Sequence, residues 1–158
     1  MSTISWGFPN QEAVTSQQVG GLQQYAEATI TSAQLMAGVA VTILPAPGPG
    51  LYNELVKVIA EVNPGVVPTD LGLCTDLKIN GINYGTIYTF KSDILTQPAP
   101  VYAVANFANW MVWDSVSFWM QSNFMFIDEA YEFFCNSPVT FCDNDVKLKI
   151  WYITRKLG

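Results

Sequence analysis

Histidine is absent from this 158-residue chain. Histidine is the commonest general base, the commonest zinc ligand and the usual activator of a serine or cysteine nucleophile. The glycines, moreover, form neither a phosphate-cradling loop nor a dinucleotide fingerprint. The sequence therefore predicts no catalytic residue, no metal site and no cofactor, and we expect a protein that is not an enzyme.

Charged side chains are also scarce, at 13% of the residues against 50% that are hydrophobic. A soluble domain ordinarily has about 25% charged residues, so this chain has too few to cover the surface of a lone monomer. We expect part of its apolar surface to contact another protein, in the first place further copies of the same chain. The net charge is −6 and no basic run exceeds Arg155-Lys156. A nucleic-acid partner is not expected, because phosphate binding needs clustered Lys and Arg.

Cysteine is sparse as well. The three cysteines, Cys74, Cys135 and Cys142, contain no CxxC pair, which argues against a disulfide framework and against a zinc site. Free thiols in a reducing cytoplasm are the favoured interpretation, while a bridge between Cys135 and Cys142 stays open.

The sequence indicates neither a targeting segment nor a membrane span. The N-terminus lacks the basic and apolar regions of a signal peptide, so we expect the protein to stay or to assemble in the cytoplasm. The longest apolar stretch, residues 101–120, contains Asn106, Asn109 and Asp114, and its Trp and Phe residues follow strand-like spacing. That pattern favours strands over a membrane span, and membrane contact is not expected.

The beginning of the chain differs from the rest. Residues 1–28 contain five glutamines, Gly20-Gly21 and no sustained hydrophobic period. We therefore predict an N-terminal arm at 1–28 and one domain at 29–158, a length that can bury a core without disulfides or metals. Trp6 and Phe8 are large apolar groups in an arm without a core of its own. We expect them to be anchors on a neighbouring subunit.

Short apolar segments separated by turn residues fill the domain. Segments recurring every 8–12 residues or so are typical of an antiparallel sandwich or barrel, and we predict a single all-β antiparallel β-sandwich, jelly-roll-like. Residues 55–62 also fit a helical stripe, although the turns on both sides favour a strand. Residues 31–37 predict one helical turn, capped by Thr31 or Ser32. The predicted strands are 39–44, 55–62, 77–79, 86–90, 101–104, 110–113, 116–120, 124–127 and 147–154.

Two turns are marked by their residue types. Prolines at every second position from Pro45 exclude both a helix and a central strand at 45–50, so the chain must turn there. Asn80-Gly81 follows an alternating run, and this dipeptide supplies the left-handed residues of a tight hairpin turn. We predict a structural corner at 45–50 and a hairpin that turns at 80–81.

Two segments at the ends of the domain share a pattern with known proteins. They read TITSAQLMAGVAVTILPAPGPG at 29–50 and NSPVTFCDNDVKLKIWYITRK at 136–156, and together they resemble a family of small bacteriophage virion proteins. The chain departs from the family pattern at Leu51, where a lysine is usual, and at Cys142-Asp143-Asn144, where Gly-Asp-Gly is usual. The matching residues are Thr31, Ala33, Gln34, Leu35, Pro45, Ala46, Pro47, Gly48, Gly50, Asn136, Pro138, Asp143, Leu148, Lys149 and Tyr152.

The resemblance implies a β-sandwich module that decorates a capsid or belongs to a spike or fibre. It implies a place in the virion after assembly in the host cytoplasm, and contacts with itself, as a homotrimer, and with other capsid proteins. Trp, Tyr and Phe are enriched in cores and interfaces. With the capsid that the resemblance implies, we assign five residues to the capsid or subunit interface: Trp6, Phe8, Trp110, Trp113 and Trp119. The alternative is a carbohydrate- or receptor-binding module, in which such aromatic rings stack on sugars.

Two acidic groups admit a chemical interpretation. Asp143-Asn144-Asp145 offers oxygen ligands for calcium, but no Gly and Glu follow at the spacing of a calcium loop, and a turn is favoured. Asp128, Glu129 and Glu132 could include the carboxylate pair of a glycosidase. In an extended segment Glu129 would face away from the other two, so a charged, solvated edge strand is the better explanation.

Overall fold

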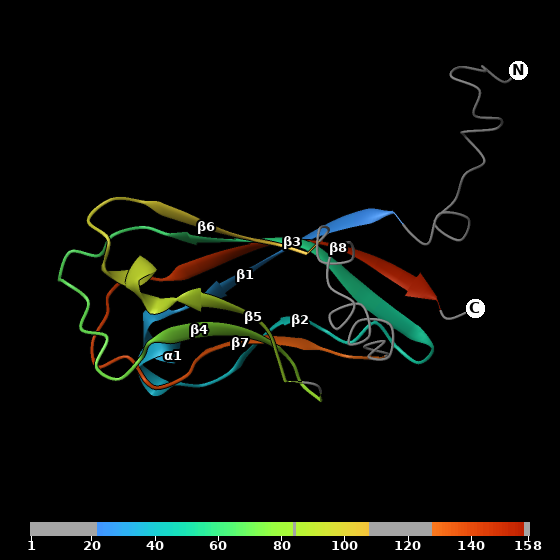
Figure 1. The fold of residues 1–158 in the computed structure, drawn as a ribbon, viewed down its shortest axis with the longest axis horizontal. Coiled ribbons are helices and arrows are strands. Elements are labelled where there is room, and N and C mark those ends of the chain that lie inside the picture. The colour runs from blue at the N-terminus through green and yellow to red at the C-terminus, as the bar shows by residue number, and fades with distance from the viewer. Residues whose placement is uncertain (1–21, 84, 108–127, 157–158) are drawn as a thin grey trace, which may run out of the picture.

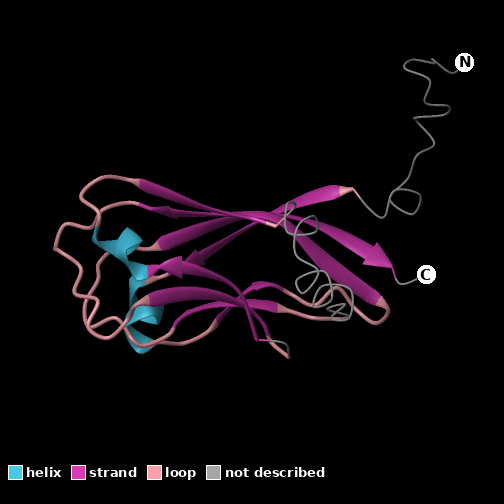
Figure 2. Cartoon of the chain, viewed as in Figure 1, coloured by secondary structure: helices cyan, strands magenta, loops and turns pink. Residues whose placement is uncertain are grey.

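The computed structural model describes residues 22–83, 85–107 and 128–156. Its elements are β1 Gln23–Ile30, α1 Ser32–Ala37, β2 Val41–Leu44, β3 Leu51–Val62, β4 Asp76–Gly81, β5 Gly85–Lys91, a 3-10 helix Ser92–Thr96, β6 Val101–Asn106, β7 Tyr131–Cys135 and β8 Val146–Lys156. The strands form two four-stranded sheets, β1-β8-β3-β6 and β2-β7-β4-β5, that pack as two layers (Figures 1 and 2). Every pairing is antiparallel, so the predicted all-β sandwich is confirmed.

The strands pair in a nested order. β1 pairs with β8, β2 with β7, β3 with β6 and β4 with β5. The chain is thus one long antiparallel hairpin with its tip between β4 and β5, rolled so that successive pairs lie alternately in the two sheets. The β3–β8 and β4–β7 pairings then close each sheet. Eight strands in this double-sheet arrangement form a jelly roll.

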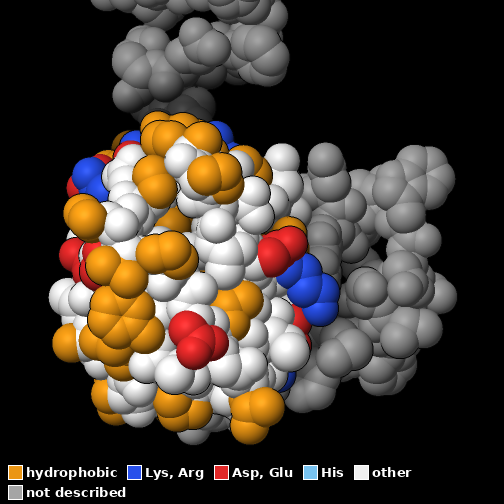
Figure 3. Space-filling model, turned by 90° about the vertical axis from the view of Figure 1, so that its left-hand side faces the viewer, with side chains coloured by type: hydrophobic (Ala, Val, Ile, Leu, Met, Phe, Trp, Pro, Cys, Tyr) orange, Lys and Arg blue, Asp and Glu red, His pale blue; other side chains and the backbone are white. Residues whose placement is uncertain are grey.

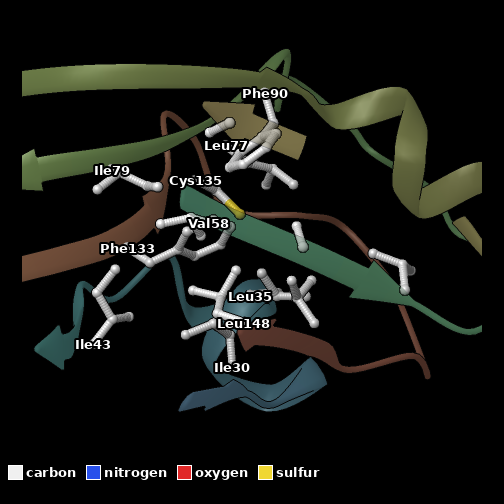
Figure 4. Packing of buried hydrophobic residues seen from close by; sticks show 14 of the residues in the cluster. Ile30, Leu35, Ile43, Val58, Leu77, Ile79, Phe90, Phe133, Cys135 and Leu148 are labelled. Carbon is white, nitrogen blue, oxygen red and sulfur yellow. The ribbon is translucent and has the colours of Figure 1, made fainter. Parts of the chain in front are cut away.

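Side chains that alternate along the strands fill the space between the sheets. β8 turns Val146, Leu148 and Ile150 inward, and β4 contributes Leu77 and Ile79 from the opposite sheet, all of them fully buried. Figure 4 shows Leu148 and Leu77 on opposite sides of this layer. Burying each such side chain stabilises the fold by about 1.5–3 kcal/mol, and this core needs no disulfide.

The predicted helical turn is confirmed as α1, with Thr31 as its N-cap. The Thr31 hydroxyl accepts a hydrogen bond from the Gln34 N–H at 3.3 Å, and Gln34 Oε1 accepts one from the Thr31 N–H at 2.9 Å. This reciprocal pair is a capping box. Leu35 is buried in the core, and the helix ends at Gly38, whose φ of 65° is left-handed. A Cβ at Gly38 would lie 2.8 Å from the Pro138 ring, so this position requires glycine.

The sequence does not predict β1, which is an edge strand. Ala26 and Ala28 pack against the core and alternate with exposed residues, but only Ile30 of the eight residues is buried. Alanine is a poor strand former, so this alternation is a weak signal. β1 begins at Gln23 and pairs with β8 along its whole length. Residues 23–28 therefore belong to a sheet and not to an arm, and the rest of the predicted arm, 1–21, lies outside the described residues.

The sequence also fails to predict β7, which lies between β2 and β4. The expectation of a charged edge strand near Glu132 is therefore wrong. Tyr131, Phe133 and Cys135 face the core, and their burial outweighs the single charge of Glu132, which pairs in register with Thr42 on one side. The other predicted strands correspond to β2, β3, β4, β5, β6 and β8 with shifted boundaries, and those at 110–113, 116–120 and 124–127 lie outside the described residues.

The hairpin at Asn80-Gly81 exists, but the prediction that it turns at these two residues is wrong. Both belong to β4 and pair with Thr86 and Gly85 of β5. Gly81 also pairs with Tyr131 of β7, so the third strand extends β4 beyond the dipeptide. The turn follows Gly81 because the pairing with β7 overrides the local preference of Asn-Gly.

The sandwich has two distinct ends (Figure 1). The loop end consists of α1 and residues 63–75, 92–100 and 136–145. The turn end consists of residues 45–50, 82–83 and 128–130, and the described chain also begins and finishes there. The predicted corner 45–50 connects β2 in one sheet to β3 in the other. Within the described ranges no helix has the length and hydrophobicity to cross a membrane.

Candidate functional site

All five residues that the sequence assigns to an interface, Trp6, Phe8, Trp110, Trp113 and Trp119, lie outside the described residues. Phe107, beside the aromatic middle of the chain, is described. Its ring packs edge-on against Tyr88 of β5 at 5.8 Å between centroids, and Tyr88 in turn packs against Phe90 at 4.8 Å. These three rings therefore close one side of the sandwich, where β5 and β6 lie at the sheet edges.

Asp128 fixes the corner at the turn end. Its φ of 53° is left-handed, which places its carboxylate beside the corner. The Asp128 Oδ1 atom accepts a hydrogen bond from the Gly48 N–H at 2.9 Å, and the Asp128 N–H donates to the Leu51 carbonyl at 2.7 Å. A second contact holds the start of the corner, because Asn53 Nδ2 donates a hydrogen bond to the Pro45 carbonyl at 3.2 Å. The left-handed backbone of Asp128 thus serves a structural contact.

Glu129 fixes the hairpin turn and is fully buried. Its carboxylate accepts hydrogen bonds from the Asn83 N–H at 2.5 Å and from Asn83 Nδ2 at 2.6 Å. Beside it, the Tyr131 hydroxyl donates to the Asn53 carbonyl at 2.6 Å, and burial raises the pKa of Tyr131. Asp128 and Glu129 thus each bind the backbone of a different turn.

The acidic group 143–145 ties separate loops together at the loop end. Asp143 Oδ2 accepts the N–H groups of Val66 and Val67 at 2.8 and 2.9 Å, and Asp145 Oδ1 accepts the Ser32 N–H at 2.7 Å. The buried Asn144 donates to the Leu95 carbonyl at 3.0 Å. Residues 142–145 form a loop without a regular turn, and Asp143, Asn144 and Asp145 each bind the backbone of another segment. Across 22–83, 85–107 and 128–156, no cluster of acidic or cysteine side chains could hold a metal ion.

The two sequence segments that carry the family resemblance contact one another at the loop end. The Val139 N–H donates to the Leu35 carbonyl at 3.1 Å, and Pro138 lies against Gly38. Asn136, another matching residue, accepts the N–H groups of Thr75 and Asp76 through its side-chain oxygen, both at 3.0 Å. The matching residues described here therefore have structural roles, in a helix cap, in loop hydrogen bonds and in packing.

The loop end presents apolar side chains to solvent on a well-held backbone (Figure 3). Val66 is 96% exposed and Leu73 is 83% exposed. The loop that carries them pairs with Phe141 through two backbone hydrogen bonds of Asp70, at 2.8 and 3.0 Å. At Gly72 the φ is +56°, and a Cβ would lie 2.2 Å from Thr140 Oγ1. The exposed apolar groups are thus held in place.

The outer face of the β1-β8-β3-β6 sheet combines aromatic rings with ion pairs. The Tyr25 and Trp151 rings pack at 5.1 Å, and Lys57 Nζ lies 4.4 Å from the Trp151 ring centroid. Since β8 lies between β1 and β3, Tyr25 and Lys57 flank Trp151 from opposite sides. The ion pairs are Lys147–Glu27 at 3.1 Å, Lys149–Glu61 at 2.7 Å and Arg155–Glu54.

The three cysteines are free and buried, so the bridge between Cys135 and Cys142 is not formed. Burial raises the pKa of Cys135, with Cys74 close by as a further cause. Burial, followed by the negative charges of Asp143 and Asp145, raises the pKa of Cys142 to about 11. A thiol with so high a pKa is a poor nucleophile at neutral pH, because the thiolate is the reactive form.

No protein-family model matches the chain, and no curated protein matches it. Among solved structures, a chain of the cyanophage Pam1 capsid asymmetric unit is similar, with 18% sequence identity and a TM-score of 0.47 over 97% of this chain and 91% of that chain. A likeness at this level establishes neither a common fold nor a common role. The jelly-roll topology rests on the strand pairings alone.

Proposed function

We propose that the protein is a non-enzymatic structural component of a bacteriophage virion. In this role it decorates a capsid, or forms part of a spike or fibre, and contacts other capsid proteins and further copies of itself as a homotrimer. The resemblance of segments 29–50 and 136–156 to phage virion proteins carries the proposal, and it gains support because Leu35 and Val139 join these segments in the fold. Jelly rolls are frequent in viral capsid proteins, and this analogy of fold adds support.

The point at which residues 1–21 join the described chain suggests which end of the sandwich faces the particle. The described chain begins at the turn end, at Leu22, next to its C-terminal residues (Figure 1). Trp6 and Phe8 precede this point, and we assign them to the contact with the capsid. The turn end would then face the particle.

Deletion of residues 1–21 tests this role. We expect the shortened protein to keep its β-type circular dichroism, because β1 begins only at Gln23, but to be lost from purified particles. The double variant W6A/F8A in the full chain should show the same loss. Deletion of residues 1–28 is the matched comparison, and it should destabilise the fold, because it removes most of the strand that pairs with β8. Normal incorporation of the 1–21 deletion would refute the arm as anchor.

A glycan array separates this role from the carbohydrate-binding alternative. A decoration protein should show no saturable binding to any glycan, whereas a sugar-binding module should bind at least one class. Among the described aromatic residues, Trp151 contacts Lys57 and Tyr25, and the tryptophans on which the alternative is based, Trp110, Trp113 and Trp119, lie outside the described residues.

A further inference from the structure

The loop end is acidic as well as apolar. Its segments, α1 and residues 63–75, 92–100 and 136–145, contain no Lys or Arg and four aspartates, Asp70, Asp93, Asp143 and Asp145. The exposed side chains of Val66 and Leu73 belong to the same end, where Figure 3 shows hydrophobic side chains on the surface together with acidic ones. Two loop ends would repel each other if they met face to face, so a two-fold contact between identical loop ends is disfavoured.

The backbone of this end is ordered before any partner binds. Asp143 holds the N–H groups of Val66 and Val67, and the Asp70–Phe141 bridge holds the other half of the loop. Within that half, the Gly72 N–H donates to Asp70 Oδ1 at 3.0 Å. A loop that is already ordered loses little conformational entropy on binding. The free energy gained by burying its exposed apolar side chains is therefore not spent on ordering the loop.

The same chain contains a surface of complementary character. On the outer face of the β1-β8-β3-β6 sheet the side chains of Tyr102, Val104 and Tyr25 are 60%, 49% and 48% exposed. This face also holds the largest group of basic residues in the chain, Lys57, Lys147, Lys149 and Arg155, interspersed with Glu27, Glu54 and Glu61. Four basic and three acidic side chains leave one positive charge in excess, in a chain whose net charge is −6.

We propose that the loop end of one copy docks on the outer face of the β1-β8-β3-β6 sheet of a second copy. Val66 and Leu73 would cover the exposed Tyr102 and Val104, while the aspartates of the loop end approach the basic side chains, Lys57 among them. Because two different surfaces meet, the contact is heterologous and closes into a ring only if the rotation between copies allows it. The proposal rests on the self-association included in the proposed function and specifies its surfaces.

Complementation between two variants tests this contact. V66E/L73E alters the loop end alone, and Y102E/V104E alters the sheet face alone; all four side chains are exposed, so both variants should fold. Sedimentation velocity over a concentration series should show self-association of the unaltered protein. Each variant alone should associate roughly tenfold more weakly or worse, as the loss of central apolar contacts does in other interfaces.

A mixture of the two variants should form a one-to-one pair, because each retains the surface that the other lacks. Raising the ionic strength should weaken this pair. The control I82E changes an apolar side chain that is 51% exposed at the turn end, and it should associate like the unaltered protein.

Three outcomes would overturn the contact. The unaltered protein could be monomeric throughout, the variants could associate normally, or their mixture could fail to pair. If V66E/L73E self-associates normally but is lost from particles, the loop end binds another virion protein instead. In each case, incorporation of the unaltered protein into particles would still support the virion role, so failure of this contact and failure of the proposed function are distinguishable.

Discussion

The two ends of the sandwich are both held by carboxylates, but in different ways. At the turn end the fully buried Glu129 binds Asn83. At the loop end Asp143 and Asp145 are exposed and bind backbone N–H groups of distant loops. A buried carboxylate is costly when its partner is lost, whereas exposed groups exchange their partners for water. The turn end is therefore fixed from within the core, and the loop end is fixed at its surface, where apolar groups remain exposed.

The substitution E129A is expected to have the largest effect. It leaves the Asn83 N–H and side-chain amide without their acceptor, and we expect it to lower the free energy of unfolding by about 2–3 kcal/mol in a urea titration. The counterpart at the loop end, D143A, should cost about 1 kcal/mol, because water replaces the lost acceptor. Equal costs would contradict the difference between the ends, and E129Q, which keeps the shape and one acceptor oxygen, is the matched control.

Two glycines with left-handed backbones sharpen the comparison. Gly50, in the corner, has a φ of +74° and nothing within 4 Å of an added Cβ, whereas at Gly72 the Cβ would meet Thr140 Oγ1 at 2.2 Å. G50A should cost about 1 kcal/mol for backbone strain, and G72A about 2 kcal/mol or more, since a steric clash is added. Chemical denaturation measures both. A G72A/T140A double variant should recover the clash contribution, and no recovery would show that Thr140 is not its cause.

The corner itself should tolerate the loss of one proline. P47A removes a constraint on the unfolded chain and should lower the free energy of unfolding by at most about 1 kcal/mol. Thermal unfolding and incorporation into particles should both be measured. If incorporation is lost while thermal stability is unchanged, the corner is a binding loop and not only a connection between β2 and β3.

A small acid sensitivity should come from the outer sheet face. The hydrogen bond from Lys149 holds the pKa of Glu61 below its usual 4.5, and the bonds from Tyr25 and Lys147 do the same for Glu27. A carboxyl with a lowered pKa in the folded state stabilises the fold above its unfolded pKa, and this contribution is lost as the pH falls through the folded pKa. Thermal unfolding between about pH 6 and pH 3 should show this loss, and K149M should reduce it. An unchanged pH dependence in K149M would exclude this ion pair as a source.

Prediction from sequence succeeded where the signal is local. Thr31 and Gln34 form a capping box within four consecutive residues. In the first half of β8, apolar residues at every second position face the core, as the alternation in the sequence predicts. The lack of CxxC pairs favours free thiols, and all three cysteines are free and buried. The sequence could not locate Glu129 as a buried acceptor, because its partner Asn83 is 46 residues away.

The sequence by itself determined the fold class, since apolar alternation and proline corners are properties of short segments that any tertiary context must respect. Only the tertiary structure decided the roles of β1, β7 and the Asn80-Gly81 dipeptide. β1 is a strand because β8 pairs with it, and Gly81 is in a strand because Tyr131 of β7 lies beside it. The physical reason is that hydrogen bonds between distant strands and shared burial outweigh the small local preferences of a few residues.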